Sequence, residues 1–433
     1  MYSSNWNWVG AQWWKFDFHA HTMASSDYGK GANQTVLKQR SSREWLLNYM
    51  RAEIDCVVVA DHNIGEAIDN LKEEYKKLKV ENISGFRELS IFPGIEITAQ
   101  SEIHILGIFP LDKTSTDINS VVDRCQYRGT KGSSDNCTEM TPVEVIKEIV
   151  RSGGIPIPAH IDLDKGLFRQ LSGHTLNQIL DCEQLIAAEK FDKNYLLPDA
   201  YKQKKLNWSF VLGSDQHHPT GSASNRYPGS HFTWVKMSKP SLDGLRLALL
   251  DGSLSLKRSD ECPDNPNKHS ALAIESATDK DTKYMGRGEE MTFRFNPWLN
   301  CIIGGRGTGK STLIEFLRLI FRRTDDIPKS LEDDLSKYQD ISTGRMDDKL
   351  LLNESDMSSL YKKDSTCFKI QWDAKGGKPP ILQMPEGKAG TGEIKQRFPV
   401  RIFSQKEIFE LWLTGPMKPI TKYGGLPKPT GCV

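Results

Sequence analysis

The chain has 433 residues, a formal net charge of +1, 38% hydrophobic residues and 26% charged residues. This composition is typical of a soluble globular protein, and the length allows two or three domains. The near-neutral charge excludes recognition of nucleic acid or a membrane by overall charge alone, although it is compatible with a local basic groove. With no membrane-length apolar run and no secretory signal, the sequence predicts a cytoplasmic protein without a membrane partner. The eight cysteines include no CxxC pair and predict reduced thiols.

Short apolar runs alternate with amphipathic stretches over residues 15–250. The apolar runs predict strands at Lys15–His19, Cys56–Ala60, Leu89–Ile97, Ile103–Phe109, Ile155–Ala159 and Trp208–Gly213. The amphipathic stretches predict helices at Ser42–Glu53, Glu66–Lys79, Pro142–Ser152 and Ser241–Leu250. This alternation predicts an α/β domain around a parallel sheet, either open or closed into a barrel. Several runs end in polar clusters, which is where α/β barrels place their catalytic groups.

The composition changes after residue 250. Residues 251–290 are polar and without clear periodicity, and they predict a linker and the start of a second domain. A partial P-loop NTPase α/β domain is predicted over residues 291–412, with a helix at about Lys310–Arg322 and strands at Met291–Phe295, Leu299–Ile303, Cys367–Trp372 and Val400–Phe403. The Pro/Gly-rich residues 413–433 predict a disordered tail. Residues 1–14 form a Trp-rich segment.

The tryptophans of that segment have two interpretations. They either stack on nucleic-acid bases or, the favoured alternative, cover a barrel opening or pack at an interface. The residues concerned are Trp6, Trp8, Trp13 and Trp14.

Histidine, aspartate and glutamate residues, which can bind metals, lie at the ends of the predicted strands or inside them. The two imidazoles of an HxH motif can reach one ion where the backbone turns, and imidazole suits Zn, Mn or Fe. A glutamate inside an apolar strand is costly unless it is paired or ligating, and a carboxylate can bridge two cations. Each residue alone has an ordinary structural explanation, such as a helix cap for a strand-end aspartate. The whole set predicts a metal centre: His19, His21, Asp61, His62, Glu96, His104, His160, Asp215 and His217.

The ordered motifs HAH, DHN, GIE, HILG, PAH and GSDxH resemble those of the polymerase and histidinol phosphatase (PHP) superfamily over about residues 15–250. The resemblance implies a distorted (βα)7 barrel with up to three metals at the carboxyl ends of the strands. It implies that His19, His21, Glu96 and Asp215 hold a first metal. Glu96 would bridge to a second metal, which His104 and His160 also hold. A third metal would be held by His62, His217 and Asp27. Members of the superfamily often have histidine at the position of Asp27. By the same resemblance Asp61 orients a ligand, and the catalytic residues are Asp61, Glu96 and Asp215.

Two or three divalent metals, Zn, Mn or Fe, would activate a water for phosphoryl transfer, so no serine or cysteine nucleophile is needed. A cationic side chain could hold the substrate phosphate. The candidates are Arg43, Lys165 and Arg226, and each could equally be a solvated surface residue.

Residues 304–312 match the pattern GxxxxGK[ST] between a predicted strand and a predicted helix, which is the context that a phosphate-binding loop needs. The loop is expected to hold the phosphates of ATP, with Lys310 reaching the β- and γ-phosphates and Ser311 ligating Mg²⁺. The expected nucleotide-binding residues are Gly304, Gly305, Arg306, Gly307, Thr308, Gly309, Lys310, Ser311, Thr312 and Gln405.

The segment around this loop resembles the amino-terminal part of SMC-like ABC-type ATPases, and Phe403–Lys406 resembles their Q-loop, in which Gln405 would contact Mg²⁺ and the attacking water. No LSGG-type signature and no apolar run ending in Asp-Glu follows Gln405. We therefore expect half of an ATPase domain, as in a truncated product of a longer protein, with weak or hydrolysis-incompetent nucleotide binding. A homodimer or oligomer formed through this domain is compatible with the sequence.

The leading hypothesis is a metal-dependent phosphoesterase, specifically a nuclease acting on DNA or RNA, regulated by ATP at the second domain. The resemblance to PHP–ATPase fusions implies nucleic-acid processing or phage defence. One alternative is a small-molecule phosphatase of the histidinol-phosphatase type, against which the ATPase domain argues. Another is a non-catalytic, nucleotide-switched nucleic-acid-binding module, against which the near-complete ligand set argues.

Overall fold

The structure is a computed structural model that describes residues 8–221, 226–267, 272–344, 346–364 and 366–413. Trp6 and the predicted tail from residue 414 lie outside the described residues. The described residues form two compact units, one spanning residues 11–267 and the other comprising residues 8–10 and the described residues from 272 onward. The boundary between the units thus falls inside the segment 251–290.

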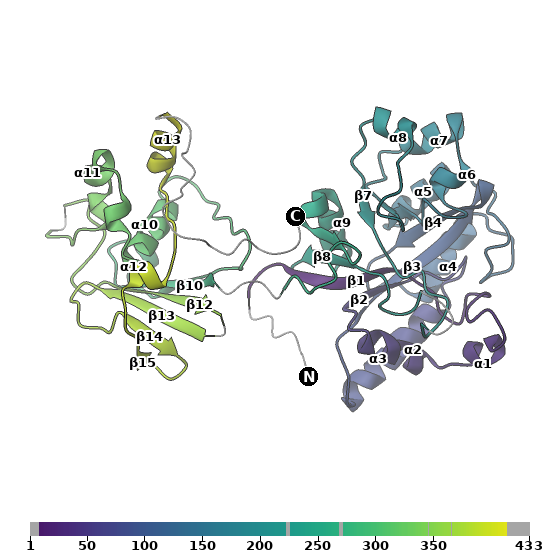
Figure 1. Ribbon diagram of the computed structural model, residues 1–433, viewed down its shortest axis with the longest axis horizontal. Coiled ribbons are helices and arrows are strands. Elements are labelled where there is room, and N and C mark those ends of the chain that lie inside the picture. The colour runs from purple at the N-terminus through teal and green to yellow at the C-terminus, as the bar shows by residue number, and fades with distance from the viewer. Residues whose placement is uncertain (1–7, 222–225, 268–271, 345, 365, 414–433) are drawn as a thin grey trace. The chain divides into compact units, whose positions relative to one another are not determined.

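The first unit is built around a seven-stranded sheet with the strand order β5-β4-β3-β2-β1-β8-β9 (Figure 1). Its strands are β1 (Gln12–Ala20), β2 (Cys56–Val59), β3 (Ser90–Ala99), β4 (Ile103–Ile108), β5 (Ile155–Pro158), β8 (Thr233–Met237) and β9 (Leu256–Arg258). The pairs β1–β2 and β2–β3 are parallel, whereas β4 and β8 run antiparallel to both of their neighbours. The sheet is therefore mixed.

A separate parallel pair, β6 (Ala187–Glu189) and β7 (Ser209–Val211), connects the segment after β5 with strand β1. On one side, the Ile161 N–H donates to the Glu189 carbonyl at 2.9 Å, just after β5. On the other side, the Asp215 N–H donates to the His19 carbonyl of β1 at 2.7 Å. The predicted α/β domain is therefore confirmed, with a curled sheet. The prediction of a parallel sheet is wrong, because β4 and β8 run antiparallel to their neighbours, and the seven-stranded βα barrel stays a prediction.

Nine helices are present in the described part of this unit. They are α1 (Gln34–Lys38), α2 (Ser42–Arg51), α3 (Ala67–Glu81), α4 (Ser115–Arg124), α5 (Pro142–Arg151), α6 (Leu167–Gln170), α7 (Gly173–Leu180), α8 (Asp199–Gln203) and α9 (Leu242–Asp251). Three of them begin with a capping box, as at α5, where Thr141 and Glu144 satisfy each other's backbone N–H groups. Phe16, Val58 and Phe92 lie in the core that the sheet buries.

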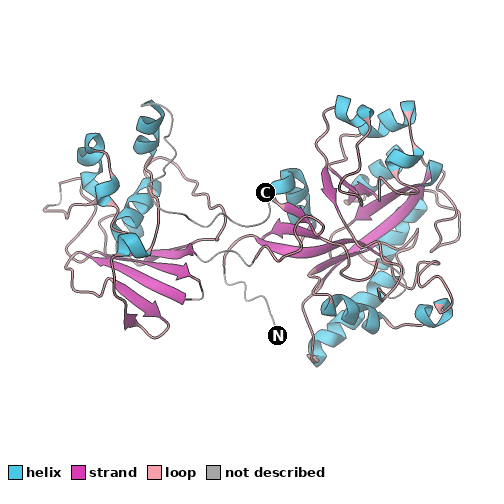
Figure 2. Ribbon diagram, viewed as in Figure 1, coloured by secondary structure: helices cyan, strands magenta, loops and turns pink. Residues whose placement is uncertain are grey.

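The second unit contains a six-stranded antiparallel sheet with the order β11-β10-β12-β13-β14-β15. Its strands are β10 (Leu272–Lys280), β11 (Met291–Arg294), β12 (Asp356–Lys363), β13 (Thr366–Asp373), β14 (Ile381–Met384) and β15 (Lys388–Ala389). The helices α10 (Lys310–Ile320), α11 (Glu332–Leu335), α12 (Ile394–Arg397) and α13 (Gln405–Leu413) lie on one side of it (Figure 2). Phe316 and Ile320 of α10 pack into its core.

Two strands predicted in this unit are absent from the described residues. The segments 299–303 and 400–403 have no strand geometry, and Leu299 and Ile303 are 86% and 95% exposed. A strand needs a neighbour to accept its backbone hydrogen bonds, and the six strands of this sheet pair with one another instead. Those two predictions are therefore wrong, whereas the strands predicted near Met291 and Cys367 and the helix predicted at Lys310 are confirmed.

The seven described cysteines are all free thiols, in agreement with the prediction. Within the described residues, no helix combines the length and the apolar character needed to cross a bilayer.

Candidate metal centre and phosphate-binding loop

The backbone of the first unit directs the predicted ligands toward one another. His19 lies on β1, Glu96 on β3 and His104 on β4, and other ligands follow directly after β2, β5 and β7. His160 and Asp215 have left-handed backbone conformations, with φ of 27° and 46°. Such conformations are uncommon outside glycine and cluster at functional sites, where the surrounding structure enforces them.

His19, His21, Glu96 and Asp215 surround one point. The Nε2 atoms of the two histidines are 3.0 Å apart. Glu96 Oε2 lies 3.4 Å from His19 Nε2 and 3.5 Å from His21 Nε2. Asp215 Oδ1 lies 3.6 Å and 3.5 Å from the same two nitrogens. The structure therefore brings together the four side chains expected around the first metal.

Glu96 also contacts a second group of imidazoles. Its Oε1 atom lies 2.6 Å from His104 Nδ1 and 3.2 Å from His160 Nε2. Its Oε2 atom lies 2.7 Å from His62 Nδ1. One fully buried carboxylate thus faces five histidines, which is the geometry expected of a bridging ligand.

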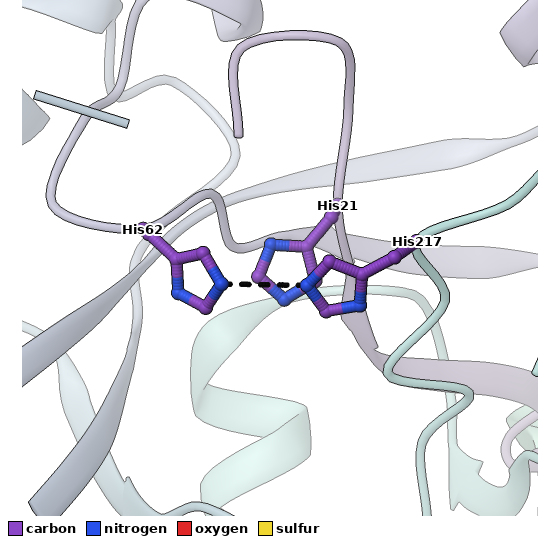
Figure 3. A group of neighbouring side chains, drawn as sticks. All are labelled: His21, His62 and His217. Carbon is purple, nitrogen blue, oxygen red and sulfur yellow. Dashed lines mark hydrogen bonds between the residues drawn. The ribbon is translucent and has the colours of Figure 1, made fainter. Parts of the chain in front are cut away.

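The third group consists of His21, His62 and His217, whose rings approach one another from separate segments (Figure 3). The Nε2 atoms of His62 and His217 are 3.3 Å apart. Asp27 Oδ2 lies 3.3 Å from each of these two nitrogens. Asp27, the residue at which the sequence departs from the superfamily pattern, therefore lies beside both histidines of the predicted third subsite.

The donor set fits divalent cations better than a hydrogen-bond network. Glu96 Oε2 is buried and accepts no hydrogen bond from the described residues, although three imidazole nitrogens lie within 3.5 Å of it. His104 Nε2 and His160 Nδ1 are buried and unpartnered in the same way. Buried polar atoms are rarely left unpaired, and a metal ion is one accepted explanation.

Neighbouring histidines lower the pKa values of two buried carboxylates, Glu96 and Asp215. Burial favours the neutral acid, but His104, His19 and His62 outweigh it and hold the pKa of Glu96 well below its usual range. For His21, burial together with neighbouring imidazoles lowers the pKa well below its ordinary value. For His62, burial lowers the pKa, but Glu96 and Asp27 raise it to about 10. His62 must therefore lose a proton before it can ligate a metal.

Asp61 acts on the ligands through a serine. Its carboxylate accepts hydrogen bonds from the Thr22 N–H, the Thr22 hydroxyl and the Ser25 hydroxyl, each at 2.7 Å. The Ser25 hydroxyl lies 2.9 Å from His21 Nδ1. Asp61 thus fixes the turn that carries His21 and leaves His21 Nε2 to face the centre.

Glu189 is a site residue that the sequence reasoning missed. It is fully buried, and its Oε2 atom lies 2.9 Å from His19 Nδ1 and accepts the His160 N–H at 3.1 Å. Its Oε1 atom accepts the Gly213 N–H at 3.2 Å. A carboxylate on the far nitrogen of a ligating histidine fixes the ring and its tautomer. The available signal was a glutamate at the end of the apolar run LIAAE, whereas Glu96 was identified inside an apolar strand.

Glu189→Gln is expected to lower metal affinity by about 10–100-fold, because loss of an outer partner of a ligating histidine has that magnitude. Competition titration with a chromophoric chelator measures the change. Glu148→Gln is the matched control, since Glu148 is also buried but lies on α5 and pairs with Arg124 and Arg151. Unchanged affinity in Glu189→Gln, or an equal loss in both variants, would contradict the role of Glu189.

An open cavity of about 460 Å³ adjoins the centre and is lined by His160, Asp162, Leu163, Asp164, Arg169, Asp215 and Arg226. Arg226 donates to Asp215 Oδ2, and its guanidinium lies 4.2 Å from the centre of the Phe191 ring. The other two candidates for phosphate binding are engaged elsewhere. Arg43 pairs with Glu81, and Lys165 donates to the Ser134 carbonyl at 2.8 Å. Of the three, Arg226 is the one beside the predicted metal ligands.

The loop Gly304–Thr312 leads into α10 in the second unit and includes its first three residues, as expected, but the strand expected before the loop is absent from the described residues. Lys310 Nζ donates to the carbonyls of Gly304 and Gly305 at 2.7 and 2.6 Å, so the lysine folds back over its own loop. Gly307 and Gly309 have φ of 80° and 86°, a backbone that glycine adopts without strain. The loop therefore has the turns that would place N–H groups around an anion.

A cavity of about 860 Å³ adjoins this loop. Seven of the predicted nucleotide-binding residues line it: Arg306, Gly307, Thr308, Gly309, Lys310, Ser311 and Thr312. Gln405 is not among the described residues that line it and instead starts α13. The cavity is large enough for a nucleotide-sized ligand.

Comparison with known protein families gives a match in the second unit. A family model described as an AAA domain matches residues 283–411. No protein with a curated description matches the chain in sequence.

Several solved structures resemble part of the chain at 14% identity. A protein described as a metal-dependent phosphoesterase, from Bifidobacterium adolescentis, matches with a TM-score of 0.33 over 55% of this chain and 96% of its own. Endonuclease Q, in complex with a 27-mer duplex that carries an abasic lesion, matches with a TM-score of 0.38 over 55% of this chain and 56% of its own. An amidohydrolase from Chromobacterium violaceum matches with a TM-score of 0.31 over 47% and 88%.

Proposed function

We propose that the first unit is a PHP-type metal-dependent phosphoesterase that cleaves phosphodiester bonds of DNA or RNA, and that nucleotide binding at the second unit regulates it. The observation that supports this most is the arrangement around Glu96, whose two oxygens lie 2.6–3.5 Å from nitrogens of five histidines. So many buried imidazoles around one carboxylate are costly unless they hold metal.

Three linked subsites would hold two or three Zn, Mn or Fe ions: His19, His21, Glu96 and Asp215; Glu96, His104 and His160; and His62, His217 and Asp27. The second and third subsites meet at His62, which also contacts Glu96. When bound, such ions polarise a phosphoryl group and supply a nucleophilic water at neutral pH. Glu189 and Asp61 orient His19 and His21, and the left-handed backbone of Asp215 directs its carboxylate toward the same point.

Arg226 would hold a non-bridging phosphate oxygen beside the centre. Its contacts with Asp215 and with the Phe191 ring fix the position of the guanidinium at the wall of the cavity. A guanidinium is always charged and suits phosphate recognition. Asp215 would thus orient both a metal, through Oδ1, and the substrate-binding arginine, through Oδ2.

Nucleic acid is the favoured substrate because an AAA-type module shares the chain, and the module resembles SMC-like ATPases. ATP with Mg²⁺ would bind at the loop Gly304–Thr312. Association of two chains through the second unit and a place in phage defence would be consistent with such a fusion. The main alternative remains a phosphatase for small phosphate monoesters.

The test strips the protein with a chelator and restores Mn²⁺, Zn²⁺, Fe²⁺ or Mg²⁺ separately. Single- and double-stranded DNA, RNA, bis(p-nitrophenyl) phosphate and p-nitrophenyl phosphate are then compared as substrates. We expect metal-dependent cleavage of the diesters, lost by more than about 100-fold in Asp215→Asn and His19→Ala, since even outer-shell changes cost 10–100-fold. ATP should change the rate in the wild type but not in Lys310→Ala.

Three outcomes distinguish the alternatives. Cleavage of p-nitrophenyl phosphate alone would favour the small-molecule phosphatase. Metal-independent binding of nucleic acid without cleavage would favour the non-catalytic module. Equal activity in the wild type and both variants would refute the assigned centre.

A further inference from the structure

The loop between α4 and α5 packs against the predicted third metal subsite. An isolated backbone bridge between Tyr127 and Thr138 closes the base of this loop. The Tyr127 hydroxyl lies 3.0 and 2.9 Å from the carbonyl oxygens of Thr130 and Ser133, within hydrogen-bond distance of both, so the tyrosine holds the tip of the loop in one conformation. We call this tip, residues 130–134, the strap.

One glycine of the strap joins two segments that supply ligands to the third subsite. The Gly132 N–H donates to the His62 carbonyl at 3.0 Å, and the Gly132 carbonyl accepts the Ser26 N–H at 2.6 Å. Ser26 directly precedes Asp27. Since Asp27 Oδ2 lies 3.3 Å from His62 Nε2, Gly132 cross-links the backbones behind two facing ligands.

Two side chains anchor the strap just after this glycine. The fully buried Asn63 side chain donates from Nδ2 to the Ser133 carbonyl at 2.9 Å. On the other side of the loop, Lys165 donates from Nζ to the Ser134 carbonyl at 2.8 Å. The strap is therefore part of the structure that supports the predicted ligands.

No side chain fits at position 132 without moving the turn that carries Asp27. Gly132 has φ of 84°, and a Cβ added to it would overlap the carbonyl oxygen of Ala24, three residues before Asp27. Gly153 has the same φ of 84°, but nothing lies within 4 Å of a Cβ added there. The two glycines thus separate the cost of a left-handed backbone from the effect of a clash.

We propose that the strap positions Asp27 and His62 for the third metal, so that occupancy of this subsite depends on Gly132. The inference rests on the proposed function, because it concerns an ion of the same centre. The Oδ1 atom of Asp27 is buried and accepts no hydrogen bond from the described residues, so the carboxylate that the strap supports has a donor atom for an ion. A shift of the turn at Ala24 would move this carboxylate away from His62 and leave the bridging Glu96 on its strand.

The test compares metal binding by the full chain after chelation, with Mn²⁺ as the only added ion. Calorimetric titration gives the affinity of each ion, and elemental analysis gives the number retained. Gly132→Ala is expected to weaken the binding of one ion by about 10–100-fold, the usual effect of losing a group that orients a ligand. Asp27→Asn should weaken the same ion. Gly153→Ala should bind every ion like the wild type.

Tyr127→Phe keeps the ring and removes the hydroxyl that contacts the strap. It should weaken the same ion by a smaller factor, which keeps the inference testable if Gly132→Ala does not fold. Wild-type binding of every ion in both strap variants would overturn the inference. So would an equal weakening of all ions in them, or an equal loss in Gly153→Ala, because neither result singles out the third subsite.

Two results for the wild-type protein separate this inference from the proposed function. If the wild type binds only two ions, Asp27→Asn retains both, and phosphodiesters are still cleaved, the role of the strap is overturned and the proposed function stands. If the wild type binds no metal, the role of the strap and the proposed function are both overturned.

Discussion

Glu96→Gln is expected to remove most of the bound metal and to lower phosphodiester cleavage by more than about 100-fold, beyond what loss of an outer-shell partner costs. The reason is that one oxygen of Glu96 faces His19, His21 and His62 and the other faces His104 and His160. The amide keeps the shape but loses the negative charge and one oxygen donor. Elemental analysis of the purified variant and a diesterase assay measure the two effects.

Glu148→Gln serves as the control for removing a buried carboxylate in the same unit, because Glu148 lies outside the cluster and pairs with Arg124, Arg151 and the Ser152 hydroxyl. It should retain the wild-type metal content. Wild-type metal content in Glu96→Gln would show that Glu96 does not bridge the subsites. A loss of metal in both variants would instead point to general unfolding, which circular dichroism would reveal.

Arg318→Ala is expected to destabilise the second unit by about 3–5 kcal/mol, the usual cost of breaking a buried ion pair. Arg318 is fully buried on α10, and it donates from Nε to Glu315 at 2.8 Å and from Nη2 to Glu407 of α13 at 2.5 Å. Alanine would leave both carboxylates buried without their cation. In thermal unfolding, the transition of this unit should fall by on the order of 10 °C.

Lys406→Ala is the control, because Lys406 pairs with Asp334 on the surface, where an ion pair contributes little. The triple variant Arg318→Met, Glu315→Gln, Glu407→Gln should recover much of the lost stability, since it removes the unpaired charges together. A midpoint unchanged by Arg318→Ala would contradict this explanation. Metal content should stay unchanged in all of these variants.

The strands that carry the predicted metal ligands were predictable because each is a short, strongly apolar run followed by a polar cluster. CVVVADH is an example: β2 ends at Val59, and Asp61 and His62 follow directly. The strand β6, at Ala187–Glu189, has only three residues, so the sequence pattern was too short to predict it as a strand. Glu189 was missed for that reason, although its chemistry resembles that of Glu96.

Predictions failed where strand formation depends on neighbours that a local pattern does not contain. LNCII has the composition of a buried strand, yet Leu299 and Ile303 are exposed. The antiparallel sheet of the second unit joins β10 to β12, which lie about eighty residues apart, and no local pattern reports that pairing. The contacts of Arg226 with Asp215 and Phe191 depend on tertiary structure in the same way, so the sequence did not distinguish it from Arg43 and Lys165.

The left-handed backbone at His160 and Asp215 also limits how the metal preference of the centre could be redesigned. Cysteine would be the natural replacement to favour zinc, because thiolate is a soft ligand. At these two positions cysteine would have to adopt a conformation that histidine, aspartate and asparagine tolerate better than most residues. At His19, on strand β1, φ is not positive, so the backbone imposes no such restriction. Engineering toward thiolate ligation should therefore begin at the strand position and leave the two turn positions to oxygen and imidazole donors.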